Sequence, residues 1–206
     1  MYKEILKEIL MSDDVVESVQ ENSCELFSIL PELKAMVKFP HNHPHHHLDV
    51  WNHTLLALSM APEDFEVRLA LLLHDIGKPF CYQDEEVRHF RGHPKKSAEI
   101  ANRVLNRLGF SPDERKRYEY LIANHDTPIQ NVEMDSFVWD RTLPEKLFQL
   151  QCCDGLAHHP AKLEKRKEYL AEAYHYVYSG TPDIRFQDWL NHNPANAKVL
   201  QRERGE

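Results

Sequence analysis

The sequence predicts an all-α protein, a helical bundle with an N-terminal helical addition. Apolar residues recur at the three- and four-residue spacing of helices along most of the 206-residue chain. No stretch sustains the two-residue alternation that is typical of half-buried strands. With only 6 glycines, the chain also has few of the turn-forming residues that a β-sandwich needs. We therefore expect an N-terminal addition over residues 1–40 and a single globular unit over residues 41–206.

The first half of the chain is predicted to be helical from its start. Residues 1–10 form an amphipathic pattern, and residues 16–30 repeat apolar side chains at helical spacing before Pro31. A further apolar stripe covers residues 50–60. Residues 65–75 are almost wholly apolar, which indicates a buried helix that ends near Gly77 and Pro79, with the glycine at a C-cap position.

The second half carries clear helix boundaries. A helix is expected over residues 94–108, with Gly109 as its stop. Ser111 and Glu114 form a capping box that opens the next helix, which carries His125 on its apolar side. Further helices are expected over residues 143–155 and 160–178, and loops over residues 41–47, 80–92 and 127–136.

Composition excludes several classes of protein. Lysine and arginine total 25 against 33 acidic residues, and a net charge of −8 argues against a general nucleic-acid binder. The longest apolar run, residues 69–73, is too short to span a membrane, and the N-terminus resembles no cleavable signal. None of the 4 cysteines forms a CxxC pair. We expect buried, reduced thiols and a cytoplasmic location.

The pair His74-Asp75 is the centre of the functional argument. An ionised aspartate at the end of so apolar a helix is costly unless it is paired or bound to a metal, and the adjacent histidine favours a metal. His53, His125 and Asp154 also lie where the helical pattern predicts core. Each alone is more often a satisfied core residue, but together they indicate a metal centre.

The order of these residues resembles a known family. His53, then His74-Asp75, then Asp154 is similar to the HD superfamily of metal-dependent phosphohydrolases, and the inserted His93 and His125 resemble its two-metal branch. The spacing over about residues 41–160 is most similar to the HD domain of some bacterial CCA-adding tRNA nucleotidyltransferases. No nucleotidyltransferase head is found in the sequence, so the resemblance does not carry CCA addition to this chain.

The resemblance implies a ligand set and an activity. His53, His74, Asp75 and Asp154 would hold one divalent ion, and the catalytic Asp75 would bridge to a second ion held by His93 and His125. Iron, manganese, magnesium, cobalt, nickel and zinc are not distinguished. The implied reaction is hydrolysis of a phosphomonoester or phosphodiester, with a small phosphorylated molecule, a nucleotide or cyclic phosphate, as substrate. Two alternatives stay open: a di-iron oxygenase of the same superfamily, and a non-catalytic regulatory or RNA-associated module.

Several further residues and segments have a functional interpretation, and for most of them a structural one is open as well. Lys78 could contact the phosphate as a catalytic residue, or it could be a cation at a helix C-terminus. His47 and His89 are candidate substrate contacts. Most of the histidine-rich segment 41–47 is expected to be a solvent loop. For His93, at the start of the helix predicted from Pro94, the alternative to a metal ligand is a plain loop histidine. The basic cluster over residues 162–167 is expected to be a solvated helix face.

Overall fold

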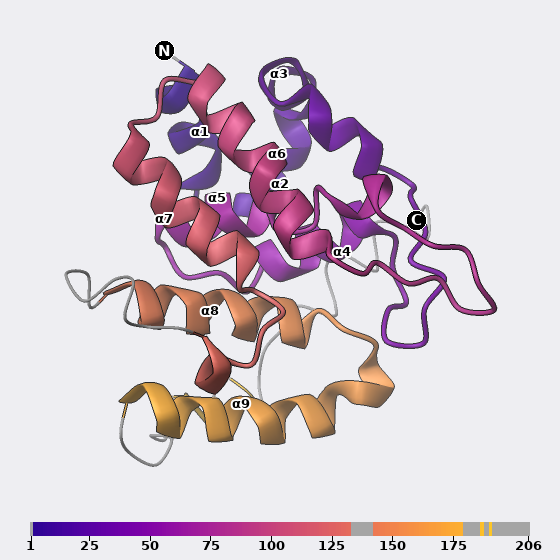
Figure 1. The fold of residues 1–206 in the computed structure, drawn as a ribbon. Coiled ribbons are helices and arrows are strands. Elements are labelled where there is room, and N and C mark those ends of the chain that lie inside the picture. The colour runs from indigo at the N-terminus through magenta and orange to yellow at the C-terminus, as the bar shows by residue number, and fades with distance from the viewer. Residues whose placement is uncertain (1, 133–141, 179–185, 188–189, 191–206) are drawn as a thin grey trace.

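The computed structural model describes residues 2–132, 142–178, 186–187 and 190, and these residues form an all-α fold (Figure 1). The described residues contain no strand, only isolated antiparallel bridges between Pro40 and Asp49 and between Gln83 and His89. The predicted fold class is confirmed. No helix in this part of the chain is long and apolar enough to cross a membrane.

The N-terminal part consists of α1 (Tyr2–Leu10), α2 (Val15–Glu21), α3 (Ser23–Ile29) and the 3₁₀-helix η1 (Pro31–Met36). The prediction of one continuous helix over residues 16–30 is wrong, because the segment forms two helices that are separated at Asn22. Leu6 and Leu10 of α1 are fully buried in a core that also contains the leucines of residues 69–73. The division of the chain near residue 40 stays a prediction.

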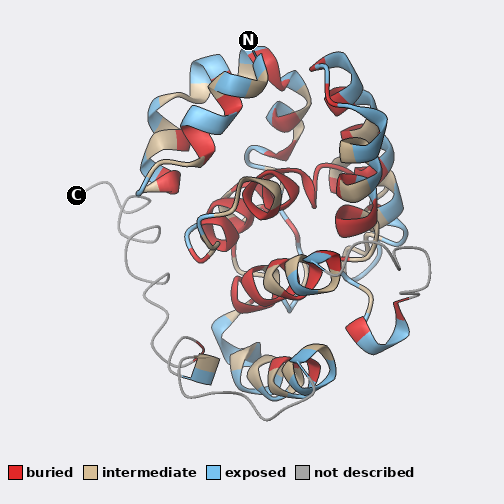
Figure 2. Cartoon of the chain, turned by 90° about the vertical axis from the view of Figure 1, so that its left-hand side faces the viewer, coloured by how far each residue is buried: buried red, intermediate tan, exposed pale blue. Residues whose placement is uncertain are grey.

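Two central helices, α4 (Val50–Leu58) and α5 (Phe65–Leu73), carry the most buried segment of the chain. Their N-termini are capped by aspartates: Asp49 Oδ1 accepts from the backbone N–H of Asn52 at 2.8 Å, and Asp64 Oδ1 accepts from that of Val67 at 3.0 Å. Figure 2 shows that buried residues gather on the inward-facing sides of the helices and exposed residues on their outer sides. A site at the end of α5 therefore lies deep in the protein.

Gly77 does not cap α5 as the sequence pattern suggested. Helix α5 ends at Leu73, and Gly77 has φ −82°, which any residue can adopt. The glycine is needed for space instead, because a Cβ there would lie 2.6 Å from the backbone nitrogen of Ser97. This close approach brings α6 (His93–Arg107) against the turn that follows α5. The short 3₁₀-helix η2 (Lys78–Phe80) continues from that turn.

The boundaries that the sequence sets at Gly109 and Ser111 are confirmed. Gly109, at φ 83°, follows the end of α6, and both hydrogen bonds of the Ser111–Glu114 capping box begin α7 (Pro112–Ala123). Because α7 ends at Ala123, His125 lies in the turn after the helix rather than on it. The expected loop over residues 127–136 contains the 3₁₀-helix η3 (Ile129–Asn131), and its residues 133–136 lie outside the described chain.

The C-terminal part is α8 (Thr142–Leu156), η5 (Pro160–Lys162) and α9 (Leu163–Tyr178), so the helix expected over residues 160–178 begins with a 3₁₀ turn. Helix α8 lies between the rest of the bundle and α9 (Figure 1). All four cysteines are free; Cys152 and Cys153 are buried as expected, Cys81 is half-buried, and Cys24 lies exposed on α3. The expectation of burial is therefore wrong for Cys24.

Candidate metal centre

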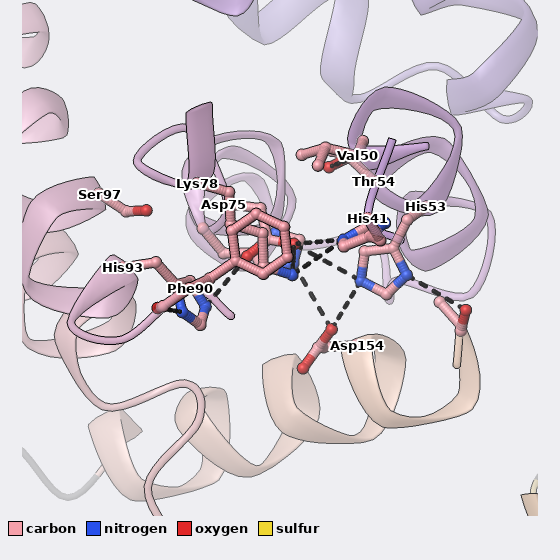
Figure 3. A network of polar contacts seen from close by, with 12 residues as sticks. His41, Val50, His53, Thr54, Asp75, Lys78, Phe90, His93, Ser97 and Asp154 are labelled. Carbon is pink, nitrogen blue, oxygen red and sulfur yellow. Dashed lines mark hydrogen bonds and ion pairs between the residues drawn. The ribbon is translucent and has the colours of Figure 1, made fainter. Parts of the chain in front are cut away.

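The structure brings the predicted ligand residues together from five places in the fold. His53 comes from α4, His74 and Asp75 from the turn after α5, His93 from the start of α6, and Asp154 from α8. Figure 3 shows His53, Asp75, His93 and Asp154 among these side chains, gathered around one place. With the turn after α7 included, they form the His–Asp cluster, whose members are His53, His74, Asp75, His93, His125 and Asp154.

Two overlapping groups within the His–Asp cluster have metal-ligand spacing. One group is His53, His74 and Asp154, and the other is His74, Asp75 and His125; the ligand atoms of each group lie within 4.8 Å of one another. In the first group, Nε2 of His53 lies 2.8 Å and Nε2 of His74 lies 3.5 Å from Asp154 Oδ1. Several donors of this kind, buried on separate elements, suit a divalent cation.

Asp75 is fully buried between two halves of the cluster. One half is His53, His74 and Asp154, and the other is His93 and His125. Its Oδ2 lies 3.3 Å from His74 Nε2 and 3.8 Å from His53 Nε2. Its Oδ1 lies 3.2 Å from His93 Nε2 and 3.8 Å from His125 Nε2. One carboxylate oxygen therefore faces each half, which is the arrangement that a bridging carboxylate requires.

Backbone carbonyls fix which ring nitrogen of each cluster histidine faces inward. In each of four cluster histidines, Nδ1 lies close to the backbone carbonyl oxygen of another residue. The distances are 3.2 Å for His53, 2.6 Å for His74, 3.0 Å for His93 and 2.7 Å for His125. A carbonyl oxygen can only accept, so each Nδ1 carries the hydrogen and the neutral ring presents the Nε2 lone pair to the cluster. This is the outer-shell arrangement that orients histidine ligands toward a metal.

Several inward-facing atoms lack a suitable protein partner. His74 Nε2 and Asp75 Oδ1 are buried and make no hydrogen bond. His93 Nε2 and His125 Nε2 lie 3.1 Å apart, which places two lone pairs against each other when both rings are neutral. Buried polar atoms in folded proteins are normally satisfied, and bound divalent cations would satisfy these four atoms. The residues present therefore fit a metal centre.

The electrostatics of the cluster also favour a cation. Burial lowers the pKa of His74, but the adjacent Asp75 carboxylate and Asp154 outweigh burial and raise it to about 10. Burial opposes ionisation of Asp154, yet its contacts with His53 and His74 hold its pKa well below the usual range. In the metal-free protein, a proton on His74 partly neutralises the Asp75 and Asp154 carboxylates. A divalent ion at the same place would neutralise them instead.

A cavity of about 290 Å³ opens onto the cluster and has a mostly basic lining. Its charged side chains include Lys78, Arg88, Arg91 and Arg166, together with Asp126 and Asp154. Phe90 adds an aromatic ring to the wall. The cavity therefore combines metal-ligand donors with positive charge, which suits an anionic ligand.

Lys78 is buried and points into the cluster, where its ammonium contacts side chains rather than the carbonyls at a helix end. Its ammonium donates to Asp75 Oδ2 at 2.7 Å and to His41 Nε2 at 3.0 Å. His41 is itself buried, and its Nδ1 donates to the carbonyl of Leu48 at 2.8 Å. A proposed contact between Lys78 and substrate stays a prediction.

The histidine-rich segment 41–47 is only in part the solvent loop that was expected, since Asn42, Pro44 and His45 are exposed but other members are not. His41 is 2% exposed and stacks on His46 at 3.8 Å between ring centroids, and His43, His45 and His46 line the cavity. His47 does not line it and packs against His159 instead, which weakens its case as a substrate contact. His89 does line the cavity.

Sequence reasoning missed several side chains at this cavity, among them His158 and Arg166. His158 is buried beside Asp154, and Arg166, expected on a solvated helix face, reaches over Gly155 to contact it. The signal for His158 was present, since it follows Asp154 by four residues. Arg166 carried no such signal, because it lies in a run of three cationic residues flanked by Glu164 and Glu168, as on an ordinary solvated helix face.

The fold and the site together define an all-α domain built around a buried His–Asp cluster that could hold divalent metal ions. Residues 45–176 match the model of the HD domain family, and the chain belongs to that family. HD domains bind divalent metals and make up a superfamily of metal-dependent phosphohydrolases. The residues matched agree with the region of the resemblance seen in the sequence.

The chain is also similar to part of several curated proteins, tRNA nucleotidyltransferases among them. It is 42% identical to the CC-adding tRNA nucleotidyltransferase of Thermus thermophilus over 47% of this chain and 24% of the relative. It is 33% identical to the A-adding tRNA nucleotidyltransferase of Deinococcus radiodurans over 58% and 30%. The Multifunctional CCA protein of Teredinibacter turnerae is 30% identical over 68% and 37%. The chain thus covers about a quarter to somewhat over a third of these relatives.

Proposed function

We propose that this chain is a divalent-metal-dependent phosphohydrolase that acts on a small phosphomonoester or phosphodiester, a nucleotide or cyclic phosphate. The observation that carries the proposal is the convergence of Nε2 lone pairs on two buried carboxylates, with His74 Nε2 and Asp75 Oδ1 lacking any hydrogen bond. His53, His74, Asp75 and Asp154 would hold one ion, and His93 and His125 would share Asp75 with a second.

Two bound divalent ions would supply Lewis-acid activation of the phosphoryl group and of water. The chain's own residues complete the site around them. Asp75 would keep the two positions in register through its two oxygens, and Lys78, which Asp75 and His41 hold in place, would add positive charge beside the phosphate. Arg91 and Arg166 at the cavity wall support an anionic substrate in the same way.

The proposed substrate class rests on the cavity rather than on the relatives' names. Phe90 offers an aromatic face near the cluster, which suits a nucleobase or another flat group next to the phosphate. The relatives are named for nucleotide addition to tRNA, but the chain covers only 24–37% of them. With a net charge of −8, we propose no general nucleic-acid partner and no membrane partner.

Elemental analysis of protein purified without added metal, followed by a phosphatase and phosphodiesterase screen, tests the proposal. We expect bound transition metal, and hydrolysis that a chelator abolishes and metal restores. Asp75→Asn should abolish hydrolysis, whereas Asp113→Asn, an exposed aspartate on α7, is the matched control. Hydrolysis that persists in the metal-free protein would contradict the proposal. An iron-loaded protein whose paramagnetic resonance changes on addition of oxygen, with no hydrolysis, would favour the di-iron oxygenase.

A further inference from the structure

His158 differs from every histidine of the His–Asp cluster in the partner of its Nδ1 atom. That atom lies 2.9 Å from Nη2 of Arg166. A guanidinium has donors only, so His158 Nδ1 accepts and the hydrogen of the neutral ring lies on Nε2. We propose that His158 binds the substrate by donating this Nε2 hydrogen to a phosphoryl oxygen, and that Arg166 is the positioning residue that fixes the donor. The inference rests on the proposed function.

The location of His158 supports this role. The residue is 8% exposed, and its ring lies 4.6 Å from that of His46 and 5.8 Å from that of His53, between centroids. Its Nε2 lies 3.9 Å from Asp154 Oδ1, which is too far for a hydrogen bond. Because His158 also lines the cavity, its donor is held beside the cluster, and the described residues place no acceptor at bonding distance from it.

Distance alone would suggest a different role. The ligand atoms of His46, His53 and His158 lie within 4.8 Å of one another, as those of a third metal site would. Hydrogen-bond chemistry argues against that role, since the Nδ1 lone pair of His158 is engaged by Arg166 and its Nε2 carries the hydrogen. The adjacent guanidinium charge also repels a cation and attracts an anion.

Local packing explains how Arg166 reaches His158 from α9. A Cβ on Gly155 would lie 3.0 Å from Cδ and 3.1 Å from Cγ of Arg166, so the arginine stem crosses α8 where the helix has no side chain. The guanidinium lies 6.0 Å from the ring centroid of Tyr169 and has no carboxylate partner among the described residues. No described carboxylate therefore competes with His158 Nδ1 for the donors of Arg166.

Calorimetric titration of the Mn²⁺-loaded full chain with inorganic phosphate tests the proposal. His158→Ala should weaken phosphate binding by about tenfold to a hundredfold, the range for losing a hydrogen bond to a charged group. His158→Gln, whose amide N–H can take the place of Nε2–H, should restore most of the affinity. Metal stoichiometry and melting temperature, measured on each variant, should match the wild type.

Arg166→Met and Lys165→Met form a matched pair on α9, because each removes one positive charge but only Arg166 lines the cavity. Arg166→Met should weaken phosphate binding about tenfold, and much less when His158 is already alanine, since it acts through His158. Long-range ¹H–¹⁵N spectra should place the hydrogen of His158 on Nε2 in the wild type, and Arg166→Met should allow both tautomers. Lys165→Met should leave the His158 spectrum unchanged.

Distinct results would overturn the inference. A His158→Ala chain that binds phosphate as the wild type does, or that loses one metal ion, would show that His158 is no substrate donor or is a ligand. Equal effects of Arg166→Met and Lys165→Met would reduce Arg166 to a general charge. A metal-loaded wild-type chain that binds no phosphate would instead contradict the proposed function itself. If His158→Ala fails to fold, His158→Gln and the α9 pair carry the test.

Discussion

Replacing Lys78 by methionine separates the possible roles of this side chain most sharply. Lys78 is 4% exposed, and its ammonium lies 2.7 Å from Asp75 Oδ2 and 3.0 Å from His41 Nε2. Removing one partner of a buried ion pair costs about 3–5 kcal/mol. Because Asp75 keeps His74 and His93 within 3.3 Å, we expect the metal-free variant to lose about 3 kcal/mol.

Metal affinity should change in the opposite direction. The ammonium occupies Asp75 Oδ2, the oxygen that faces His53 and His74, and so competes with a divalent ion for it. Loss of a charge-assisted hydrogen bond worth about 1.5–3 kcal/mol should tighten Mn²⁺ binding about tenfold or more. If Lys78 also contacts the phosphate, catalytic efficiency should fall about tenfold to a hundredfold.

Urea denaturation in the presence of a chelator measures the stability, and calorimetric titration with Mn²⁺ measures the affinity. Lys96→Met is the control, since Lys96 is a partly exposed lysine paired with Glu99 at 3.5 Å, and it should change stability by less than about 1 kcal/mol. Mn²⁺ affinity that is unchanged or weaker in Lys78→Met would refute the competition between ammonium and metal. Unchanged turnover would refute the contact with substrate.

Three further predictions concern the metal ions and the packing that places their ligands. Asp75→Ala should empty both metal positions, because each half of the cluster faces one of its oxygens; a wild-type metal content by elemental analysis would disprove the bridging role. His125→Ala should lose one ion, keep the other and remain helical by circular dichroism, and equal loss of both would mean that the ligands are divided differently. Gly77→Ala should destabilise the protein by about 1–3 kcal/mol in urea, because its Cβ would lie 2.6 Å from the Ser97 nitrogen. Wild-type stability there would mean that α6 can move aside.

The parts of the fold that could be predicted are those with local causes. The Ser111–Glu114 capping box and the left-handed Gly109 depend on residues within a few positions of one another, and the structure contains both. The break at Asn22 interrupts a helical repeat that has no proline or glycine, and asparagine, which favours helix caps, is only a weak local signal for it. The role of Gly77 depends on a helix that begins 16 residues later, and only the packed fold reveals it.

The candidate site was visible where polar residues interrupt an apolar pattern. His53 and Asp154 stand out because the helices around them are buried, and the structure places both in the cluster. The segment around His41 has no periodic pattern to interrupt, so nothing local distinguished a buried histidine from an exposed one. Its burial depends on Leu48, Lys78 and Phe90, two of which lie more than 30 residues away.

The 14 histidines of this chain cannot all be counted as metal ligands. The partner of Nδ1 decides which ring nitrogen carries the hydrogen, and so whether the ring offers a lone pair or a donor to the site. In His74 a backbone carbonyl takes the Nδ1 hydrogen and leaves an inward lone pair, which a cation can use. In His41 the same arrangement leaves a lone pair that Lys78 already occupies. In His158 a guanidinium reverses the tautomer and turns an acceptor into a donor. No substitution can remove a backbone carbonyl, so the ligand tautomers are fixed by the fold, whereas the tautomer of His158 depends on the single side chain of Arg166.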